Sequence, residues 1–226
     1  EALEVIDTSR VKIMWVNYPH MPTGADVKVE TFDRLIAWAK RKNILLVNDN
    51  PYSFVLTQNP QSILSRPGAK EVAVELNSLS KTFNMAGWRV GMLSGNAEII
   101  QAVLKVKSNM DSGMFYGIQQ GAINALNVDQ SWFEGLNRVY QKRKNLIKIL
   151  ATKLETQYDS KSVGLFVWAK LPERTIDSET FIDKILHEHH IFITPGTIFG
   201  SQGEGFIRFS LCVPEATIED AINRLG

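Results

Sequence analysis

The residues best suited to chemistry lie close together in the stretch Asn77 to Gly91, which reads NSLSKTFNMAGWRVG. Lys81 occupies a serine-rich turn after an apolar run, where partial burial lowers the pKa of an amine and favours the neutral form that condenses with an aldehyde to a Schiff base. Ser78 and Ser80, with the backbone N–H groups of a turn, can donate to a phosphate, and Arg89 can add a bidentate contact. A lone lysine after a strand is usually a solvated surface residue, so only the combination indicates this chemistry.

The elements that must position this stretch follow the order strand, loop, helix, strand, which is typical of an α/β domain with a largely parallel sheet. Apolar residues at helical spacing from Phe32 to Ala39 predict the helix, and the basic residues Lys40 to Lys42 suit its C-terminal end. The predicted strands are Lys12 to Asn17, Ile44 to Val47, Glu71 to Leu76 and Trp88 to Gly95.

Ligands of such sheets collect beyond the carboxyl ends of the strands. Chemistry is therefore expected in the loops after Asn17, Val47 and Leu76. Asp49 stands just beyond the second of these strand ends. The run from Tyr18 to Gly24 must be a loop, because it is interrupted by prolines and ends in a glycine.

The second half of the chain has a different pattern. Helices are expected over Glu98 to Lys107 and Gly117 to Leu126, followed by a long amphipathic helix that runs to about Gln157. We place a domain boundary inside this long helix, near Arg138, so that residues 1–137 form part of a large domain and residues 138–226 form a small C-terminal α+β domain. The elements expected after the long helix are strands at Gly164 to Lys170, Ile191 to Thr194 and Phe206 to Leu211, a helix at Ser178 to His189 and a closing helix from Glu215.

Composition limits the kinds of partner. The 226 residues carry 25 Lys and Arg against 24 Asp and Glu, and this near-neutral balance favours neither nucleic acid nor an anionic membrane surface as a partner. No apolar run approaches the ~20 residues of a membrane span, and the first residues do not resemble a signal peptide. The single cysteine, Cys212, fits a reducing compartment, so we expect a cytoplasmic protein. The histidines between His187 and His190 lack the i,i+4 spacing of a helical ligand pair, so no metal site is expected.

Five motifs in a fixed order resemble those of one enzyme family. SLSKTF followed by GWRVG resembles the Ser-x-Ser-Lys and Arg-x-Gly signature of fold-type I pyridoxal-phosphate (PLP) enzymes, the aspartate aminotransferase superfamily of class I and II. NYPHMPTG at 17–24 resembles the family's Asn-Pro-x-Asn-Pro-Thr-Gly loop, and NDNPY at 48–52 its Asp-x-x-Tyr segment. PGTIFG at 195–200 with FIRFSL at 206–211 resembles its paired closing motifs. The resemblance spans essentially the whole chain and implies the large and small domains of that fold.

The resemblance implies a role for each residue around the cofactor ring. Lys81 would form the internal aldimine with PLP and then move a proton between the substrate Cα and the cofactor C4′ as general base. Asp49 would pair with the pyridine nitrogen and keep it protonated, which makes the ring a stronger electron sink. Tyr52 would donate its hydroxyl to the phenolic oxygen. Read alone, Asp49 is a turn or cap residue and Tyr52 a half-buried aromatic.

The resemblance also implies which residues bind the charged ends of cofactor and substrate. Ser78 and Arg89 would hold the cofactor phosphate, with Ser80 as a further candidate. Arg208, in FIRFSL, would form a fork with the α-carboxylate of the substrate. Without the family pattern, Arg208 would be read as a strand arginine that faces solvent.

The chain departs from the family pattern in two ways. Met21 stands where the family has an asparagine that hydrogen-bonds the phenolic oxygen, and methionine cannot donate that bond. The expected consequence is a change in the aldimine pKa worth about 1 kcal/mol, and not a loss of chemistry. Nothing resembles the family's N-terminal phosphate loop or ring-stacking aromatic, and the sequence begins at Glu1 without a methionine. We therefore expect a C-terminal fragment that binds PLP poorly and is inactive by itself.

The function expected from the resemblance is an aminotransferase that moves an amino group between an amino acid and a 2-oxo acid. The subgroup it resembles contains aspartate, alanine and LL-diaminopimelate aminotransferases. A PLP-dependent C–S β-lyase or a decarboxylase would use the same lysine, aspartate and arginine. A non-catalytic PLP-sensing domain of a regulator is the alternative from another class. Members of the family are usually homodimers, so we expect a homodimer when the protein is intact.

Overall fold

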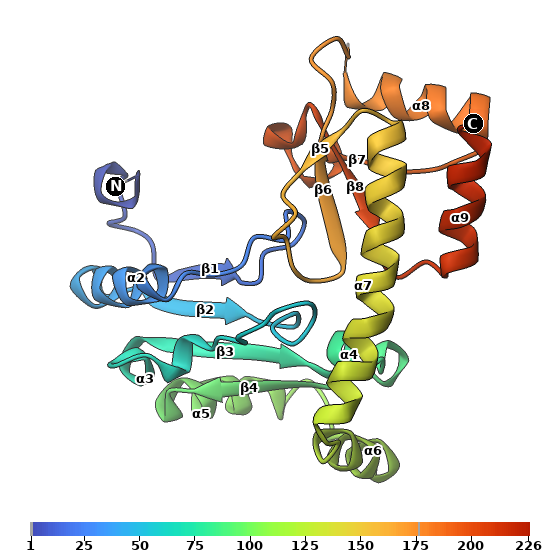
Figure 1. The fold of residues 1–226 in the computed structure, drawn as a ribbon. Coiled ribbons are helices and arrows are strands. Elements are labelled where there is room, and N and C mark those ends of the chain that lie inside the picture. The colour runs from blue at the N-terminus through green and yellow to red at the C-terminus, as the bar shows by residue number, and fades with distance from the viewer. Residues whose placement is uncertain (1, 176) are drawn as a thin grey trace. The chain divides into compact units, whose positions relative to one another are not determined.

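The computed structural model describes residues 2–175 and 177–226, which form two compact units (Figure 1). The first unit contains the chain up to Tyr18, Val27–Ser53 and Asn59–Val128, and the second contains Pro19–Asp26, Phe54–Gln58 and Asp129–Gly226. Two short segments from the N-terminal half therefore belong with the C-terminal half. The second unit takes in the whole of the long helix, and a domain boundary near Arg138 stays a prediction. Glu1 lies outside the described residues.

The first unit is built on a four-stranded sheet. Its strands are β1 (Ile13–Asn17), β2 (Leu45–Asp49), β3 (Ala73–Ser78) and β4 (Gly91–Gly95), in the order β1-β2-β3-β4. β1, β2 and β3 run parallel, and β4 pairs with β3 antiparallel. The expected α/β class with a parallel-rich sheet is confirmed.

The register of this sheet aligns the C-terminal ends of β1 and β2 with each other and with the last part of β3. Asn17 is opposite Asp49, and Asp49 is opposite Leu76. Since the three strands are parallel, the loops that follow them leave the sheet at the same edge. This edge is followed by the short helix α4 (Leu79–Thr82), in which Lys81 lies.

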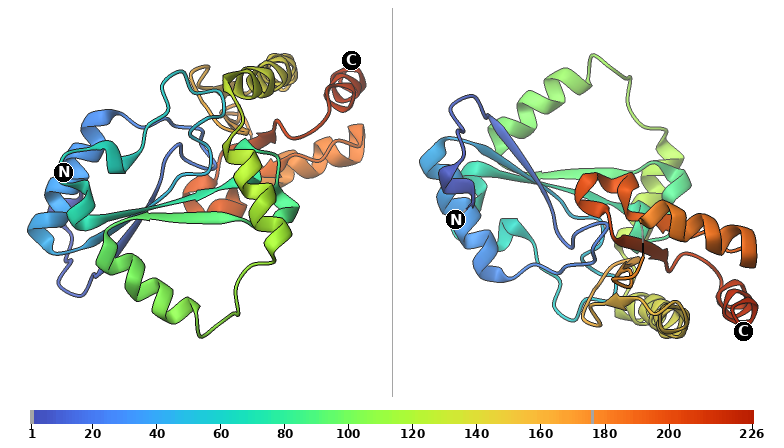
Figure 2. Two further views of the ribbon diagram at one scale, coloured as in Figure 1. Left: turned by 90° about the horizontal axis from the view of Figure 1, so that it is seen from below. Right: turned by 90° about the horizontal axis from the view of Figure 1, so that it is seen from above.

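The helices of the first unit differ in how well they are covered. α2 (Val29–Lys42) buries Phe32, Ile36, Trp38 and Ala39, and this face packs in one core with Ile44 and Leu46 at the start of β2. Its C-terminal end carries Lys40, Arg41 and Lys42 as expected. By contrast, α5 (Ala97–Lys107), which extends away from the end of β4 in Figure 2, and α6 (Tyr116–Leu126) bury no side chain. The short helices are α1 (Ala2–Val5), α3 (Ala69–Val72), η1 (Ile63–Ser65) and η2 (Ala86–Trp88).

The second unit is a small α+β arrangement, as expected. Its antiparallel sheet has the order β5-β6-β8-β7, and the helix α7 (Gln130–Lys153) runs beside α9 (Glu215–Arg224) (Figure 1). Val167, Ile207 and Leu211 are fully buried in its core. The other elements are β5 (Gln157–Tyr158), β6 (Phe166–Lys170), α8 (Ser178–His189), β7 (Thr194–Pro195), η3 (Gly196–Phe199), η4 (Ser201–Gly203) and β8 (Phe206–Ser210).

Several strand boundaries differ from the sequence prediction. Glu71 and Val72 belong to α3, so β3 begins at Ala73, because a short apolar run does not distinguish a helical turn from a strand. The polar segment from Asn77 to Thr82 is not a turn, since its first residues extend β3 and the rest form α4. β2 continues through Asp49 because the polar residues at its end still pair with β1 and β3.

The later elements are also shorter than predicted. β4 begins at Gly91, since Ala86–Trp88 form a 3-10 turn and Arg89 adopts a left-handed φ of 55°. α7 ends at Lys153, before the predicted end near Gln157. Of the run predicted as a strand from Ile191, only Thr194 pairs with β8. None of the helices in the described part of the chain combines the length and apolar character needed to cross a membrane.

Candidate active site

Asp49 ends β2 with its carboxyl group half-buried. The side-chain amide of Asn17 donates to the Asp49 backbone oxygen at 2.6 Å and so joins the ends of β1 and β2. Burial removes water from the carboxylate and raises the pKa of Asp49 above its ordinary value. Within residues 2–175 and 177–226, no basic side chain pairs with this carboxylate to offset that cost.

The segment after Asp49 is tied to the helix that carries Lys81. The Asn50 N–H donates to the Leu76 oxygen at 2.8 Å, and the Thr82 hydroxyl donates to the Pro51 oxygen at 3.3 Å. Tyr52 follows directly and is only 8% exposed. These bonds hold the Asp49 to Tyr52 segment against the end of β3 and against α4.

Ser78 caps the helix that carries Lys81. Its Oγ accepts from the Ser80 N–H at 3.1 Å and donates to the Val90 oxygen at 3.4 Å. Lys81 is half-buried between the fully buried Leu79 and the buried Thr82. The local sequence forms this short helix because a serine N-cap satisfies one of its free N–H groups.

Arg89 lies two residues before β4, whose first residue is at the same end of the sheet. Ser78 is opposite Gly91, and the Leu79 N–H donates to the Val90 oxygen at 3.1 Å. Arg89 itself is exposed, and its Nη1 donates to the Ala86 oxygen at 2.8 Å. The first unit therefore places Asp49, Tyr52, Ser78, Ser80, Lys81 and Arg89 on segments that are joined at one end of its sheet.

Arg208 belongs to the second unit, in the middle of β8. It is opposite Trp168 of β6 and Thr194 of β7. The side chain is half-buried and does not face solvent as an isolated strand arginine would. Its guanidinium carbon lies 4.1 Å from the centroid of the Phe166 ring and 4.6 Å from that of Phe199.

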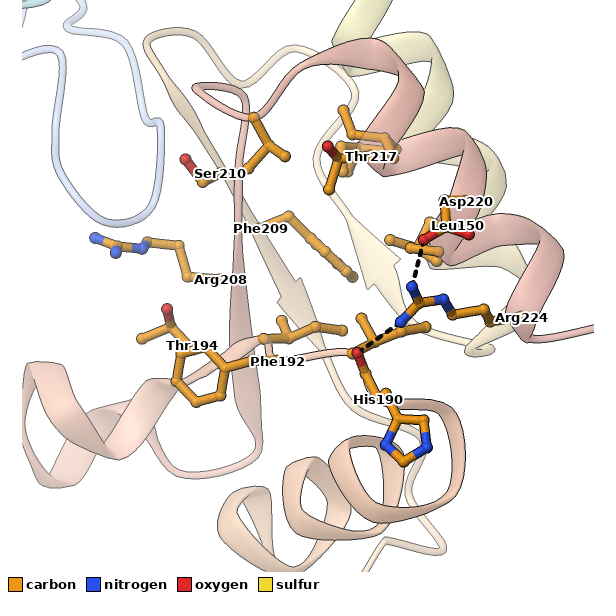
Figure 3. Close-up of a pocket in the computed structure, with 16 residues that line it drawn as sticks. Leu150, His190, Phe192, Thr194, Arg208, Phe209, Ser210, Thr217, Asp220 and Arg224 are labelled. Atoms are coloured by element: carbon orange, nitrogen blue, oxygen red, sulfur yellow. Dashed lines mark hydrogen bonds and ion pairs between the residues drawn. The ribbon is translucent and has the colours of Figure 1, made fainter.

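A cavity of about 370 Å³ lies between β8, α7 and α9, and Arg208 is among the residues that line it. Figure 3 shows that the guanidinium of Arg208 points away from Leu150, Phe209 and Thr217, which line the cavity. Arg224 closes one end by pairing with Asp220 and by donating to the His190 oxygen at 3.1 Å. The cavity is therefore not where Arg208 would receive a carboxylate.

The residues at the end of the first sheet fit PLP by type. An amine is present for the aldehyde in Lys81, a hydroxyl and a guanidinium for the phosphate in Ser78 and Arg89, and a carboxylate for a protonated ring nitrogen in Asp49. The raised pKa of Asp49 is the physical mark of a carboxylate that lacks a cationic partner within the described chain. Among the described residues, no group of His, Cys, Asp and Glu is placed to hold a metal ion.

The structure adds contacts that sequence reasoning missed. Thr82 and Asn50 join the two halves of the site, and no spacing in the sequence signals their partners. Phe166 and Phe199 lie against Arg208, and the Met21 sulfur is 3.6 Å from its Nη1. Phe166 lies two residues before Trp168, and Trp168 is opposite Arg208. Only this spacing of two could have indicated that Phe166 and Arg208 share a face of the sheet.

Known proteins share this fold and sequence. A model of the family described as aminotransferase class I and II matches residues 1–225. LL-diaminopimelate aminotransferase from Aquifex aeolicus is 40% identical over 218 residues, which are 96% of this chain and 56% of that protein. LL-diaminopimelate aminotransferase from Gloeobacter violaceus is 39% identical over 227 residues, covering 100% of this chain and 58% of that protein.

Solved structures agree with these relatives. The substrate-bound structure of BacF from Bacillus subtilis superimposes with a TM-score of 0.92 at 36% identity, covering 98% of this chain and 58% of that chain. The chain thus spans a little more than half the length of the relatives that it matches.

Proposed function

Because the chain belongs to the class I and II aminotransferase family, whose members depend on PLP, we propose that the whole protein is an aminotransferase that transfers an amino group from an amino acid to a 2-oxo acid. The observation that carries this proposal is the bonding of the Asp49 to Tyr52 segment to the end of β3 and to α4. These bonds join a half-buried carboxylate, Asp49, and an amine, Lys81, at the carboxyl edge of a parallel sheet.

The residues of this edge divide the chemistry between them. When bound, PLP supplies the electron sink for the electron pair left at the substrate Cα. Lys81 would hold the cofactor through its amine and, once freed, would take the proton from the substrate Cα and deliver it to the cofactor C4′. Asp49 would accept the N–H of the ring and keep that proton in place. Ser78 and Arg89 would hold the phosphate, with Ser80 as a further donor, and Tyr52 would donate to the phenolic oxygen.

Arg208 binds the α-carboxylate of the amino acid in this proposal. Its planar fork matches a carboxylate in two parallel hydrogen bonds. The relatives named LL-diaminopimelate aminotransferase make that amino acid the first candidate for the donor. The intact protein is proposed to be a cytoplasmic homodimer, which sedimentation of the intact protein tests.

The experiment is a half-reaction on the intact protein. Purified enzyme loaded with PLP is mixed with LL-diaminopimelate, aspartate or alanine, and pyridoxamine phosphate is measured after a single turnover. The proposal predicts pyridoxamine phosphate with at least one donor and none in Lys81→Ala. Pyruvate release from cystathionine, or CO₂ release without pyridoxamine phosphate, would instead support the lyase or the decarboxylase. Tight PLP binding without any turnover would support the sensing domain.

A further inference from the structure

We propose that Met21, Phe166 and Phe199 form a collar around the Arg208 guanidinium that sets how tightly the enzyme binds the carboxylate of its substrate, and that Lys144 positions the loop that carries Met21. The proposal rests on the proposed function in one respect, the binding of a carboxylate by Arg208. It assigns Met21 to the substrate arginine and not to the cofactor oxygen.

The two aromatic walls of the collar come from separate elements. Phe166 lies two residues before Trp168, which is opposite Arg208 across the β6–β8 pair, so Phe166 and Arg208 share a face of the sheet. Phe199 ends η3 and meets Trp168 edge to face, with ring centroids 5.7 Å apart. Trp168 in turn stacks on Phe206 at 5.3 Å. The guanidinium is therefore held by rings that are themselves packed.

The third wall is a thioether. The Met21 sulfur lies 3.6 Å from Arg208 Nη1. A thioether is a weak acceptor and a polarisable neighbour, so it contacts the cation without competing strongly with a carboxylate for its N–H groups. An asparagine oxygen at this place would be a stronger acceptor.

The loop that carries Met21 is fixed to a neighbouring turn of the second unit. The Val163 N–H donates to the Gly24 oxygen at 2.8 Å, and Gly24 has a left-handed φ of 70°. A Cβ at Gly24 would lie 2.9 Å from both the Ser162 Cβ and the Val163 oxygen. Only glycine therefore lets the loop and the turn approach so closely.

Lys144 bonds to the backbone of that turn. Its side chain is 9% exposed, and its ammonium donates to the Ser160 oxygen at 2.9 Å and to the Ser162 oxygen at 2.5 Å. Burial lowers the pKa of Lys144, and both carbonyl groups that accept from its ammonium lie in the turn that ends at Val163. The contacts thus run from Lys144 through the turn and Gly24 to Met21.

A collar of this kind affects binding in two ways. A guanidinium held between rings loses less freedom when it binds a carboxylate. Apolar walls also keep water from its faces, and a charged hydrogen bond is stronger where water is excluded. Packing alone would predict a loss of stability without any selective change in carboxylate affinity.

The test uses the intact enzyme and variants that shorten one wall at a time. Phe166→Leu and Phe199→Leu are compared with Phe192→Leu, a control at an exposed phenylalanine of the same unit. The readouts are KM and kcat for the amino donor, and the Kd of a 2-methyl amino acid, which keeps the carboxylate but has no proton at Cα to lose. Both collar variants are expected to raise KM and Kd roughly 2- to 30-fold with kcat within about twofold. The control is expected to change neither constant.

Met21 and Lys144 are tested by a cycle of variants. Met21→Ala is expected to raise both constants roughly 2- to 10-fold and to leave the pH titration of the bound cofactor's absorbance unchanged. Lys144→Met is expected to raise the same constants, and the double variant should show less than the product of the two effects, because both act through one loop. A shift in the pH titration of the cofactor's absorbance, with KM and Kd unchanged, would instead show that Met21 acts on the cofactor.

The outcomes separate the collar from the proposed function. A wild-type enzyme that neither transaminates nor binds the 2-methyl amino acid would overturn both. A wild-type enzyme that does both, with collar variants that bind the probe as tightly as the control, would overturn the collar alone. Lower melting temperatures with unchanged KM and Kd in Lys144→Met would make that lysine a structural residue only.

Discussion

At the scale of single residues, Asp49 shows a conflict between stability and function. Burial raises the pKa of Asp49, so the folded chain holds a proton there to higher pH than the unfolded chain does. Stability is therefore lost as pH rises from the ordinary value of 3.8 through the raised one, and at neutral pH the carboxylate is a cost to the protein without cofactor. Such a cost is retained where the charge serves a ligand.

Asp49→Asn is expected to raise the melting temperature of the cofactor-free protein at pH 7 and to lower kcat/KM of the intact enzyme by roughly 100-fold or more. Asp183→Asn, at an exposed position of α8, is the matched control. Calorimetry and steady-state kinetics check the two effects. A less stable Asp49→Asn protein with full activity would contradict this account of the residue.

His20 gives the loop that carries Met21 a predicted dependence on pH. Its Nδ1 is 2.7 Å from the Thr23 hydroxyl, and burial lowers the pKa of His20 from its ordinary value of 6.5. As pH falls, the unfolded chain binds the proton first, so the stability that neutral His20 contributes is complete above pH 6.5 and is lost below it.

Hydrogen exchange of the loop measures this effect. The Gly24 N–H donates to the His20 oxygen at 2.8 Å, and its protection is expected to fall as the pH drops below 6.5, after correction for intrinsic rates. His20→Gln should remove the dependence. Equal protection of Gly24 across this range in the wild type would contradict it.

Sequence and structure agree best on residue types and least on contacts. The serine-rich segment around Lys81 and the motif matches indicate the residues proposed to hold the cofactor and the substrate carboxylate, but not Phe166 and Phe199 beside Arg208. The contact of Met21 with Arg208 could not be predicted, because it joins residues far apart in the chain through a loop whose path depends on Gly24 and Val163. The order of the motifs indicates which residues take part in the chemistry, whereas tertiary contacts of this kind determine how those residues are arranged.

At the scale of elements, the sequence predicts long periodic helices well and short strands poorly. α8 has the predicted bounds, Ser178–His189, since its Asp177 N-cap and its apolar spacing agree. The bounds of β3 and β4 differ from the predicted ones because EVAVEL and WRVGMLSG each fit more than one local structure. Strand pairing decides between these structures. The assignment of Phe54–Gln58 to the second unit has no local signal either.

Asn137 of α7 connects the Phe54–Gln58 segment to the second unit. Its Oδ1 accepts from the Leu56 N–H at 2.7 Å, and its Nδ2 donates to the Phe54 oxygen at 3.0 Å. Asn137→Ala is expected to lower the free energy of unfolding by about 1–3 kcal/mol, because both backbone groups lose their partner. Asn145→Ala, at an exposed position on the same helix, should change it by less than about 0.5 kcal/mol. Equal losses in denaturant unfolding would contradict this role.

At the scale of the whole molecule, the chain spans 56% of the LL-diaminopimelate aminotransferase from Aquifex aeolicus and 58% of that from Gloeobacter violaceus. α5 and α6 bury no side chain, and large apolar residues such as Val106, Phe115 and Tyr116 are 63%, 75% and 69% exposed. Exposed apolar groups of this kind are typical of surfaces that become buried against another part of a protein or a partner.

The 226-residue chain produced alone is therefore expected to bind PLP weakly and to show no measurable transamination, while the intact protein does both. Equilibrium dialysis with PLP and a coupled assay on both proteins, with masses verified, measure the difference. Robust turnover by the 226-residue chain would contradict the expectation.

The claim that Lys81 holds the cofactor is tested most directly by chemical trapping. The intact, PLP-loaded protein is reduced with borohydride, digested and mapped by mass spectrometry. If Lys81 holds the cofactor, a phosphopyridoxyl group is expected on the peptide that contains Lys81 and on no other, and no such group is expected in Lys81→Ala. Labelling of a different lysine in the active wild-type enzyme would contradict it.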